Sequence, residues 1–278
     1  MAAANSPFSR ESTPAYIDPT KASIARVYDA GLGGKDNYAV DREVVDRLRQ
    51  VAPEIEPLAT ENRDFLIRVT RFLAGRAGIS QFLDCGSGLP TVENTHHVAQ
   101  RIQPGATVVY VDNDPTVVAH GRALLEENEL THFSVADIFD PPQVLGHPNM
   151  HRYLDFSRPI ALFQIGTLHH HDGARSPRSI MQEYVEALPS GSYVAVSHFF
   201  DPEDEDSELS RKLEHVFTNS PLGTGLFRTR TQIEDMFPGL DMVEPGLVLC
   251  ADWWPDGPHL APLVPAQRCI VGGVGRKP

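Results

Sequence analysis

Residues 82–88 read Phe-Leu-Asp-Cys-Gly-Ser-Gly, an apolar run that ends at two closely spaced glycines. Glycine lets the backbone turn sharply and approach a ligand, and the N-terminus of a following helix then faces that ligand. A second apolar run, residues 108–111, ends at Asp112. A carboxylate there can accept both hydroxyls of a ribose, because it offers two oxygens and no competing donor. The two motifs together predict a site for a nucleotide-type cofactor.

The chain around these motifs alternates between short apolar runs and helix-type segments from residue 81 onward. Such alternation is typical of a parallel sheet with helices on both faces. The runs that we expect to form strands are residues 81–84, 106–112, 132–136, 159–165, 191–198, 241–250 and 267–274. The sequence therefore predicts an α/β fold with a mostly parallel, seven-stranded sheet.

A helical segment precedes the predicted sheet. Residues 22–51 have a helical pattern that the glycines of residues 31–35 should interrupt, and a third helix is expected near residues 61–76. The expected organisation, in chain order, is a disordered tail at 1–15, a helical lid at 16–78, and one compact domain at 79–278 with a helical insertion at 201–228.

The composition restricts the partners of the protein. The chain has 24 basic and 37 acidic side chains, and its net charge of −13 repels nucleic acid and anionic membrane surfaces. Cys85, Cys250 and Cys269 form no Cys-x-x-Cys pair, so neither a disulfide framework nor a zinc site is indicated. The sequence shows neither an export signal nor an apolar run of membrane-spanning length. We expect a cytoplasmic protein that acts on a small molecule, without a nucleic-acid or membrane partner.

The residues around the glycines indicate which cofactor is bound. A dinucleotide fingerprint needs a third glycine, but Thr91 stands in that position. Asp84 comes directly before the glycine turn, where a carboxylate would repel a pyrophosphate but would favour a sulfonium or an amino group. S-adenosylmethionine carries both of these cationic groups, and it is the cofactor that we predict.

Three motifs resemble the cofactor half of class I S-adenosylmethionine-dependent methyltransferases: Asp84-x-Gly86-x-Gly88, Asp112, and Ala136-Asp137-Ile138 after the third expected strand. More narrowly, the chain resembles a bacterial family called S-adenosyl methyltransferase, formerly described as a domain of unknown function. The stretches that carry this second resemblance are residues 25–38 (Ala-Arg-Val-Tyr-Asp-Ala-Gly-Leu-Gly-Gly-Lys-Asp-Asn-Tyr), 88–91 (Gly-Leu-Pro-Thr) and 94–96 (Asn-Thr-His). The resemblance covers nearly the whole chain from about residue 16, and it implies a Rossmann-like fold.

The resemblance also implies a set of cofactor-binding residues. These are Tyr28, Asp84, Gly86, Ser87, Gly88, Asp112, Asn113, Asp137, Ile138 and Gly166. In that set Asp84 would lie near the methionine amino group, and Asp112 would hold the ribose beside Asn113. Asp137 would accept a hydrogen bond from the adenine amino group while Ile138 packs on the ring. Two alternatives remain open: Asp112 could instead cap the following helix, and Asp137 could be a turn residue.

The glycine loop at residues 31–35 does not match a phosphate-binding loop, because Asp36 follows Lys35 where Ser or Thr is required. Arg26, Tyr28 and the residues around them suggest a lid over the methionine end of the cofactor. A guanidinium can bind a carboxylate through two hydrogen bonds, and a tyrosine face can lie against a sulfonium. The alternative is a simple helix turn with tyrosines that pack in the ordinary way.

Methyl transfer from a sulfonium is an in-line displacement, so the protein mainly aligns donor and acceptor. His169 and His198 follow or end the fourth and fifth expected strands, and they are the candidate general bases; His96 is a weaker one. A metal held by His169 and His171 is a minor alternative, and we predict none. The pair Trp253 and Trp254 could line an acceptor pocket, but sealing of the core is favoured.

The function that these observations predict is methylation of oxygen or nitrogen in a small-molecule acceptor. One alternative is a sensor that binds S-adenosylmethionine or S-adenosylhomocysteine without turnover. A nicotinamide-dependent oxidoreductase is a second alternative, which Asp84 and Thr91 disfavour.

Overall fold

The computed structural model describes residues 17–91, 93–124 and 128–278. The expected tail at residues 1–15 lies outside these ranges. The strands are β1 (Gln81–Cys85), β2 (Thr107–Val111), β3 (Thr131–Ser134), β4 (Ala161–Ile165), β5 (Tyr193–Phe199), β6 (Asp241–Met242), β7 (Val248–Leu249) and β8 (Ile270–Arg276).

The strands form one mixed sheet in the order β3-β2-β1-β4-β5-β8-β6, and β7 also pairs with β8. Strands β1 to β5 are parallel, whereas β8 runs antiparallel to β5. The predicted α/β fold with a mostly parallel sheet is therefore confirmed. The strand count was wrong by one, because the run at 241–250 forms two short strands rather than one. Pro245 and Gly246 interrupt it, and proline cannot donate a hydrogen bond to a neighbouring strand.

The helices are α1 (Ile24–Gly31), α2 (Ala39–Val51), α3 (Glu56–Gly75), α4 (Thr95–Ile102), α5 (Pro115–Leu124), α6 (Pro141–Leu145), α7 (Pro148–Tyr153), α8 (Pro177–Ala187), α9 (Ser207–Thr218) and α10 (Arg230–Glu234). Three short 3₁₀ helices are η1 (Leu168–His170), η2 (Cys250–Asp252) and η3 (Pro265–Cys269). None of the helices described here is both long and apolar enough to cross a membrane.

The N-terminal helices follow the predicted pattern with one shift. The glycine loop separates α1 from α2 as expected. Helix α3 begins at Glu56, several residues before the predicted start, because Pro57 lies in its first turn. Proline is tolerated there, since the first N–H groups of a helix have no partner within the helix.

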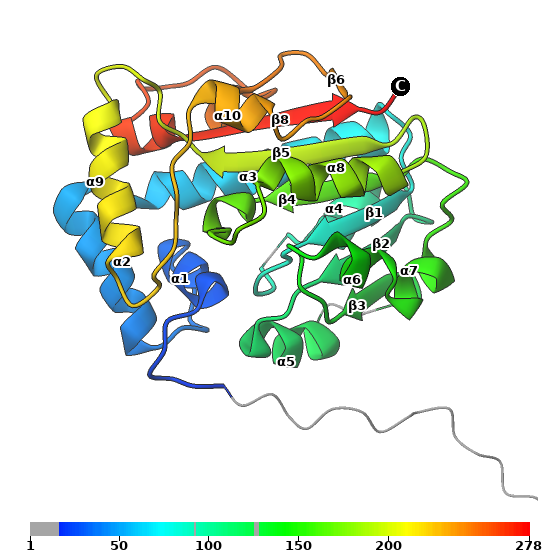
Figure 1. The fold of residues 1–278 in the computed structure, drawn as a ribbon, viewed down its shortest axis with the longest axis horizontal. Helices are drawn as coiled ribbons and strands as arrows, with labels where there is room; N and C mark the ends of the chain where they lie inside the picture. Colours follow the sequence, from blue (N-terminus) through cyan, green and yellow to red (C-terminus); the bar gives the residue numbers. More distant parts are fainter. Residues whose placement is uncertain (1–16, 92, 125–127) are drawn as a thin grey trace, which may run out of the picture.

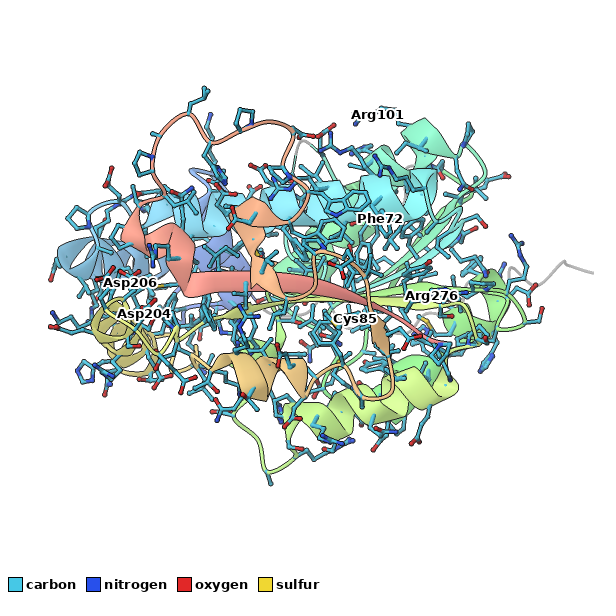
Figure 2. The ribbon with its side chains drawn as sticks, turned by 90° about the horizontal axis from the view of Figure 1, so that it is seen from above. Phe72, Cys85, Arg101, Asp204, Asp206 and Arg276 are labelled. Carbon is cyan, nitrogen blue, oxygen red and sulfur yellow. The ribbon has the colours of Figure 1, made fainter. Side chains whose placement is uncertain are left out.

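Helices cover both faces of the sheet, with α3 and α4 on one side and α8 and α10 on the other (Figure 2). Successive strand residues point to opposite faces, so Phe82 packs in one hydrophobic cluster and Leu83 in the other. Figure 1 shows α1, α2 and α9 beside the end toward which β5 points. The carboxyl ends of the parallel strands therefore face these helices.

A stripe of apolar residues on α3 is buried against the sheet, and Phe65, Val69 and Leu73 are fully covered. Trp253 packs its ring edge-on against Phe65 and Phe72, with ring centroids 5.6 and 5.7 Å apart. Neither Trp253 nor Trp254 lines the large pocket described below. The tryptophan pair therefore seals the core next to α3, as predicted.

Candidate active site

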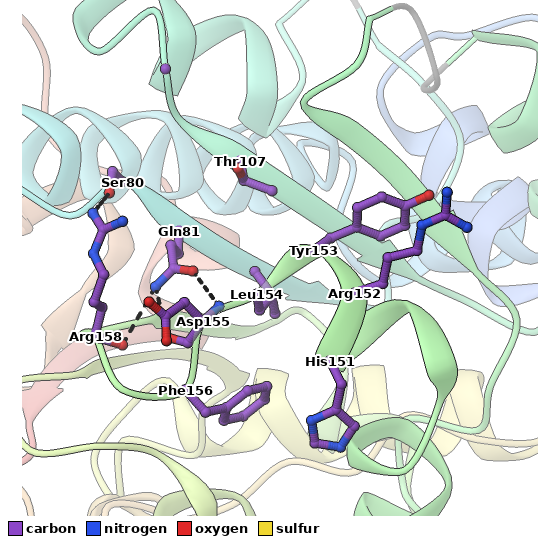
Figure 3. Close-up of a pocket in the computed structure, with 11 residues that line it drawn as sticks. Ser80, Gln81, Thr107, His151, Arg152, Tyr153, Leu154, Asp155, Phe156 and Arg158 are labelled. Carbon is purple, nitrogen blue, oxygen red and sulfur yellow. Dashed lines mark hydrogen bonds between the residues drawn. The ribbon is translucent and has the colours of Figure 1, made fainter.

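Two large hollows lie at opposite edges of the sheet. The first, of about 600 Å³, is beside the amino ends of β1 and β2 (Figure 3). Two of its polar side chains already have partners in the protein: the Gln81 amide donates to the Asp155 carbonyl at 3.1 Å, and Arg158 donates to Ser80 at 2.9 Å. The second, of about 560 Å³, lies at the carboxyl ends of the strands. Ligands of open α/β sheets bind at that edge, so the second hollow is the candidate active site.

The glycine turn after β1 forms one wall of this pocket. Gly86 has a φ of +80°, and a side chain there would collide with Thr167. Its N–H donates to the Val111 carbonyl at 2.8 Å, which fixes the turn beside the end of β2. Only glycine combines this backbone conformation with such close packing. Gly86, Ser87 and Gly88 all line the pocket at the carboxyl end of β1.

Asp112 lies at the end of β2 and lines the pocket. Its carboxylate accepts hydrogen bonds from the N–H groups of Gly88 at 3.0 Å and Asp114 at 2.9 Å. Desolvation raises the pKa of Asp112 to about 6, although these backbone hydrogen bonds act in the opposite direction. The helix-capping role falls to Asp114, whose carboxylate accepts from Thr116 N–H at 2.7 Å. Asp112 is therefore not needed as the cap, which was the alternative to its ribose role.

The residues after β3 complete the nucleotide side of the pocket. Asp137 and Ile138 line it, as does the exposed Asn113. The Asp137 carboxylate accepts from Phe139 N–H at 2.9 Å, so this residue also forms a turn. Ile138 packs close to Gly86, where it can cover one face of a flat ring.

Asp84 is 4% exposed and is not among the described residues that line the pocket. The Thr95 hydroxyl donates to its carboxylate at 2.6 Å. Burial raises the pKa of Asp84 to about 6, and the hydrogen bond from Thr95 only partly offsets this effect. A buried carboxylate with one hydroxyl partner and a raised pKa is typical of functional sites.

A hydrogen-bond network joins the helical segment to the ends of the strands. The Tyr28 hydroxyl donates to the Ala59 carbonyl and accepts from the Asn62 amide, both at 3.1 Å. Asn62 in turn accepts from the Ser197 hydroxyl of β5, which also accepts from Gly166 N–H at 2.8 Å. Tyr28 and Gly166 line the pocket, and this network holds both in place.

The arginine that faces the pocket is Arg63 and not Arg26. Arg26 is 4% exposed, pairs with Asp41 at 2.8 Å and donates to Thr116 at 2.9 Å, so it holds α1 against neighbouring helices. Arg63 of α3 lines the pocket, and its guanidinium contacts the Thr91 hydroxyl and the Glu93 carbonyl.

Sequence reasoning missed both Arg63 and its neighbour Asn62. A signal was present: Asn62 is a buried polar residue four positions after Leu58 and four before Leu66, within the buried stripe of α3.

The two candidate bases lie in different surroundings. His169 is in η1, lines the pocket and stacks on Phe199 with ring centroids 3.6 Å apart. Its Nδ1 accepts from Phe199 N–H at 3.4 Å, and burial lowers its pKa well below the ordinary range. His198 is fully buried and is not among the described pocket residues. Its Nε2 contacts Arg228 at 2.7 Å, and burial lowers its pKa to about 3.

Of the other histidines, His170 also lines the pocket, whereas His96 and His171 are not among its described lining residues. His96 is buried beside the Tyr110 hydroxyl, at 2.9 Å, and is not a described pocket residue. The His171 Nε2 lies 2.8 Å from the Arg175 carbonyl. Within residues 17–91, 93–124 and 128–278, no group of three or more His, Cys, Asp or Glu side chains could hold a metal ion.

The fold and the site together define the class of protein. A parallel sheet with a glycine turn after β1, an acid after β2 and an Asp-Ile pair after β3 is the arrangement of Rossmann-like class I methyltransferases. A family model described as S-adenosyl methyltransferase matches residues 10–278. The chain belongs to this family, and its cofactor is S-adenosylmethionine.

Two solved structures are similar over nearly their whole length. The first is a protein from Thermobifida fusca YX that is described as a methyltransferase by inference. The two sequences are 45% identical, the TM-score is 0.87, and the match covers 93% of this chain and 96% of that one. The second is a DUF574 family protein from Streptomyces avermitilis MA-4680, with 35% identity, a TM-score of 0.86, and coverage of 93% and 98%. A search of curated proteins returned no match.

Proposed function

We propose that the protein transfers the methyl group of S-adenosylmethionine to an oxygen or nitrogen atom of a small-molecule acceptor. One observation carries this proposal. A single pocket joins the predicted cofactor residues at the ends of β1, β2 and β3 to His169 and to apolar side chains beyond it. Donor and acceptor can therefore lie in line within one enclosed space, which is the main requirement of the reaction. The three buried, free cysteines support a reducing compartment such as the cytoplasm.

The proposed roles follow the positions of the side chains. Asp112 accepts from the ribose hydroxyls, and Asp137 and Ile138 recognise the adenine. Arg63 binds the carboxylate of the methionine group, because it is the basic residue that faces the pocket. Asp84 favours the cationic end of the cofactor from behind the glycine turn.

In the reaction, a lone pair of the acceptor attacks the methyl carbon while the bond from that carbon to sulfur breaks. The electron pair goes to sulfur, which leaves S-adenosylhomocysteine, and the proton that the acceptor loses passes to solvent water. His169 is the histidine that we place beside the acceptor. Its Nδ1 accepts from the Phe199 N–H, so the neutral ring carries its proton on Nε2. In this state His169 orients the acceptor by donating a hydrogen bond.

The second candidate function is a sensor that binds cofactor without turnover. A sensor needs no space beyond the cofactor, whereas this pocket extends to α2 and α9. The test is incubation with S-adenosylmethionine and a panel of small alcohols, phenols and amines, with detection of S-adenosylhomocysteine and methylated product by mass spectrometry. The proposal expects product with at least one acceptor class. Tight cofactor binding without product across the panel would favour the sensor instead.

A further inference from the structure

We infer that the methyl acceptor is an uncharged, largely apolar aromatic molecule, bound in a lobe of the pocket between α2, α9 and the end of β5. This inference rests on the proposed function and deepens it by naming the acceptor class. We call this region the apolar lobe. Its walls are Val45, Leu48, Ile55, Phe199, Phe217 and Leu222.

The apolar lobe is separate from the cofactor half of the pocket because the strand order divides them. The cofactor residues follow β1, β2 and β3, which form one side of the sheet, whereas Phe199 ends β5 on the other side of β4. Helix α2 contacts α9 across this second side. An acceptor bound there lies next to the cofactor without competing for the ribose and adenine positions.

The walls of the apolar lobe are part of the hydrophobic core. Val45, Leu48, Ile55, Phe199 and Phe217 are each at most 6% exposed, and Leu222 packs against the same cluster. Transfer of apolar area from water to such a surface is favourable in proportion to the area removed from water. The lobe therefore gains affinity from an apolar ligand and offers little to a polar one.

Flat rings are favoured by the aromatic stack that forms the floor of the lobe. The Phe199 ring stacks on His169 at 3.6 Å, on Phe217 at 5.1 Å and on Phe227 at 4.9 Å, with interplanar angles of 14°, 27° and 21°. Aromatic pairs of this kind are stabilised beyond the area that they bury. An aromatic acceptor can extend the stack.

The charges around the pocket exclude ionised acceptors. Among the described residues that line it, Arg63 is the only Lys or Arg, and it lies on the cofactor side in contact with the loop after Gly88. On the lobe side the acid is Glu56, which is already paired with Arg49 at 2.7 Å. His169 and His170 are neutral, because burial lowers the pKa of both, that of His170 to about 3. An ion in the lobe would lose its hydration without gaining a partner.

The test uses three naphthalene probes of similar shape in the presence of saturating S-adenosylhomocysteine: neutral 2-naphthol, anionic 2-naphthoate and cationic 2-naphthylmethylammonium. Binding is measured by naphthyl fluorescence and by calorimetry. We expect 2-naphthol to bind, and each charged probe to bind at least about tenfold more weakly. No binding of 2-naphthol, or equal binding of all three probes, would overturn the inference.

A pair of variants locates the probe. Leu222→Trp fills the lobe from a half-buried loop position, and Leu260→Trp is the matched control at a side chain that is 99% exposed. Leu222→Trp should weaken 2-naphthol binding by about tenfold or more, with unchanged affinity for S-adenosylhomocysteine, and Leu260→Trp should change neither. If Leu222→Trp leaves 2-naphthol binding intact, the lobe is not the site.

The experiment distinguishes an error in the proposed function from an error in the acceptor class. If the proposed function is wrong, the unchanged protein gives no heat of binding with S-adenosylhomocysteine. The 2-naphthol titrations are then repeated without cofactor, where binding that Leu222→Trp abolishes still supports an apolar aromatic site. Cofactor binding without 2-naphthol binding rejects the acceptor class alone.

Discussion

Asp112 illustrates how one side chain can hold a loop and still be available to a ligand. Its raised pKa of about 6 has a consequence for the pH dependence of cofactor binding. Only the ionised carboxylate accepts from both ribose hydroxyls, so binding favours ionisation. The affinity for S-adenosylhomocysteine should be constant between about pH 6.5 and 7 and fall as the pH decreases below about 6.

Asp112→Asn tests this account by calorimetry between pH 5 and 7. The variant should bind S-adenosylhomocysteine more weakly by about 1.5–3 kcal/mol at pH 7, because hydrogen bonds to a charged group are lost. It should also lose the decrease in affinity at low pH. If the variant keeps this decrease in affinity, the titrating group is another carboxyl group, such as Asp84.

The buried charge of Asp84, behind the glycine turn, should lower the stability of the protein. Burial raises its pKa to about 6, above the ordinary value for Asp, so the folded state disfavours the ionised form. This cost is absent below about pH 4 and complete above about pH 6. Asp84→Asn, which cannot ionise, should therefore be more stable than the unchanged protein by about 2–3 kcal/mol at pH 7, and the difference should disappear near pH 4.

Urea denaturation at pH 4 and pH 7 measures this difference. The amide oxygen of Asn can still accept from Thr95, so the comparison isolates the charge. An equal difference in stability at the two pH values would show that the Asp84 charge carries no burial cost.

Arg63 is proposed to bind the methionine carboxylate, and Arg63→Gln separates this role from general support of the pocket. The variant should weaken S-adenosylhomocysteine by about 10- to 100-fold, the range expected when a charge-assisted hydrogen bond is lost. Methylthioadenosine has the same nucleoside but no amino-acid end, and its affinity should not change. Equal weakening of both ligands in calorimetric titrations would mean that Arg63 acts only by holding the loop at Thr91 and Glu93.

At the scale of elements, one hydroxyl of β5, that of Ser197, links α3 to the turn after β4. Ser197 donates to Asn62 and accepts from Gly166 N–H, and both it and Asn62 are buried. Ser197→Ala leaves these groups without their partner, so the free energy of unfolding should fall by about 1–3 kcal/mol. The exposed Ser179→Ala in α8 is the control and should change it by less than about 0.5 kcal/mol. Equal effects in chemical denaturation would contradict the proposed linkage.

The elements also show what the sequence could predict. Strands β1, β2, β4 and β5 were predictable because each is rich in apolar side chains and is buried on both faces, as parallel strands are. The run at 241–250 was misjudged because its pairing is limited by Pro245 and Gly246, which apolar content does not reveal. The start of α3 was placed too late because proline was treated as a boundary and not as a first-turn residue.

The candidate site was predictable where its residues are local to strand ends, as with Gly86, Gly88 and Asp112. Arg63 and Asn62 were missed because α3 precedes the sheet and reaches the pocket only through tertiary packing, and the one signal was a polar Asn62 within the apolar stripe of α3. His169 lines the pocket and His198 does not, and this difference also depends on the fold. His198 and Phe199 point to opposite sides of β5, and the structure places Phe199 toward the pocket.

At the scale of the whole molecule, the sheet gathers the cofactor residues and the apolar lobe at one edge. In the other hollow, at the amino ends of β1 and β2, the side chains of Gln81 and Arg158 are hydrogen-bonded to the protein itself (Figure 3). The chain has a net charge of −13. Its pocket is lined mainly by apolar side chains and by polar residues of loops. This arrangement agrees with a small-molecule ligand.

The central claim is that the pocket at the carboxyl ends of the strands binds S-adenosylmethionine. Calorimetric titration of the protein with S-adenosylmethionine, S-adenosylhomocysteine and NAD tests it most directly. We expect saturable heat with the first two ligands, loss of affinity in Asp112→Ala by about 1.5–3 kcal/mol, and no heat with NAD. Binding of NAD, or no heat with either adenosyl ligand, would contradict it.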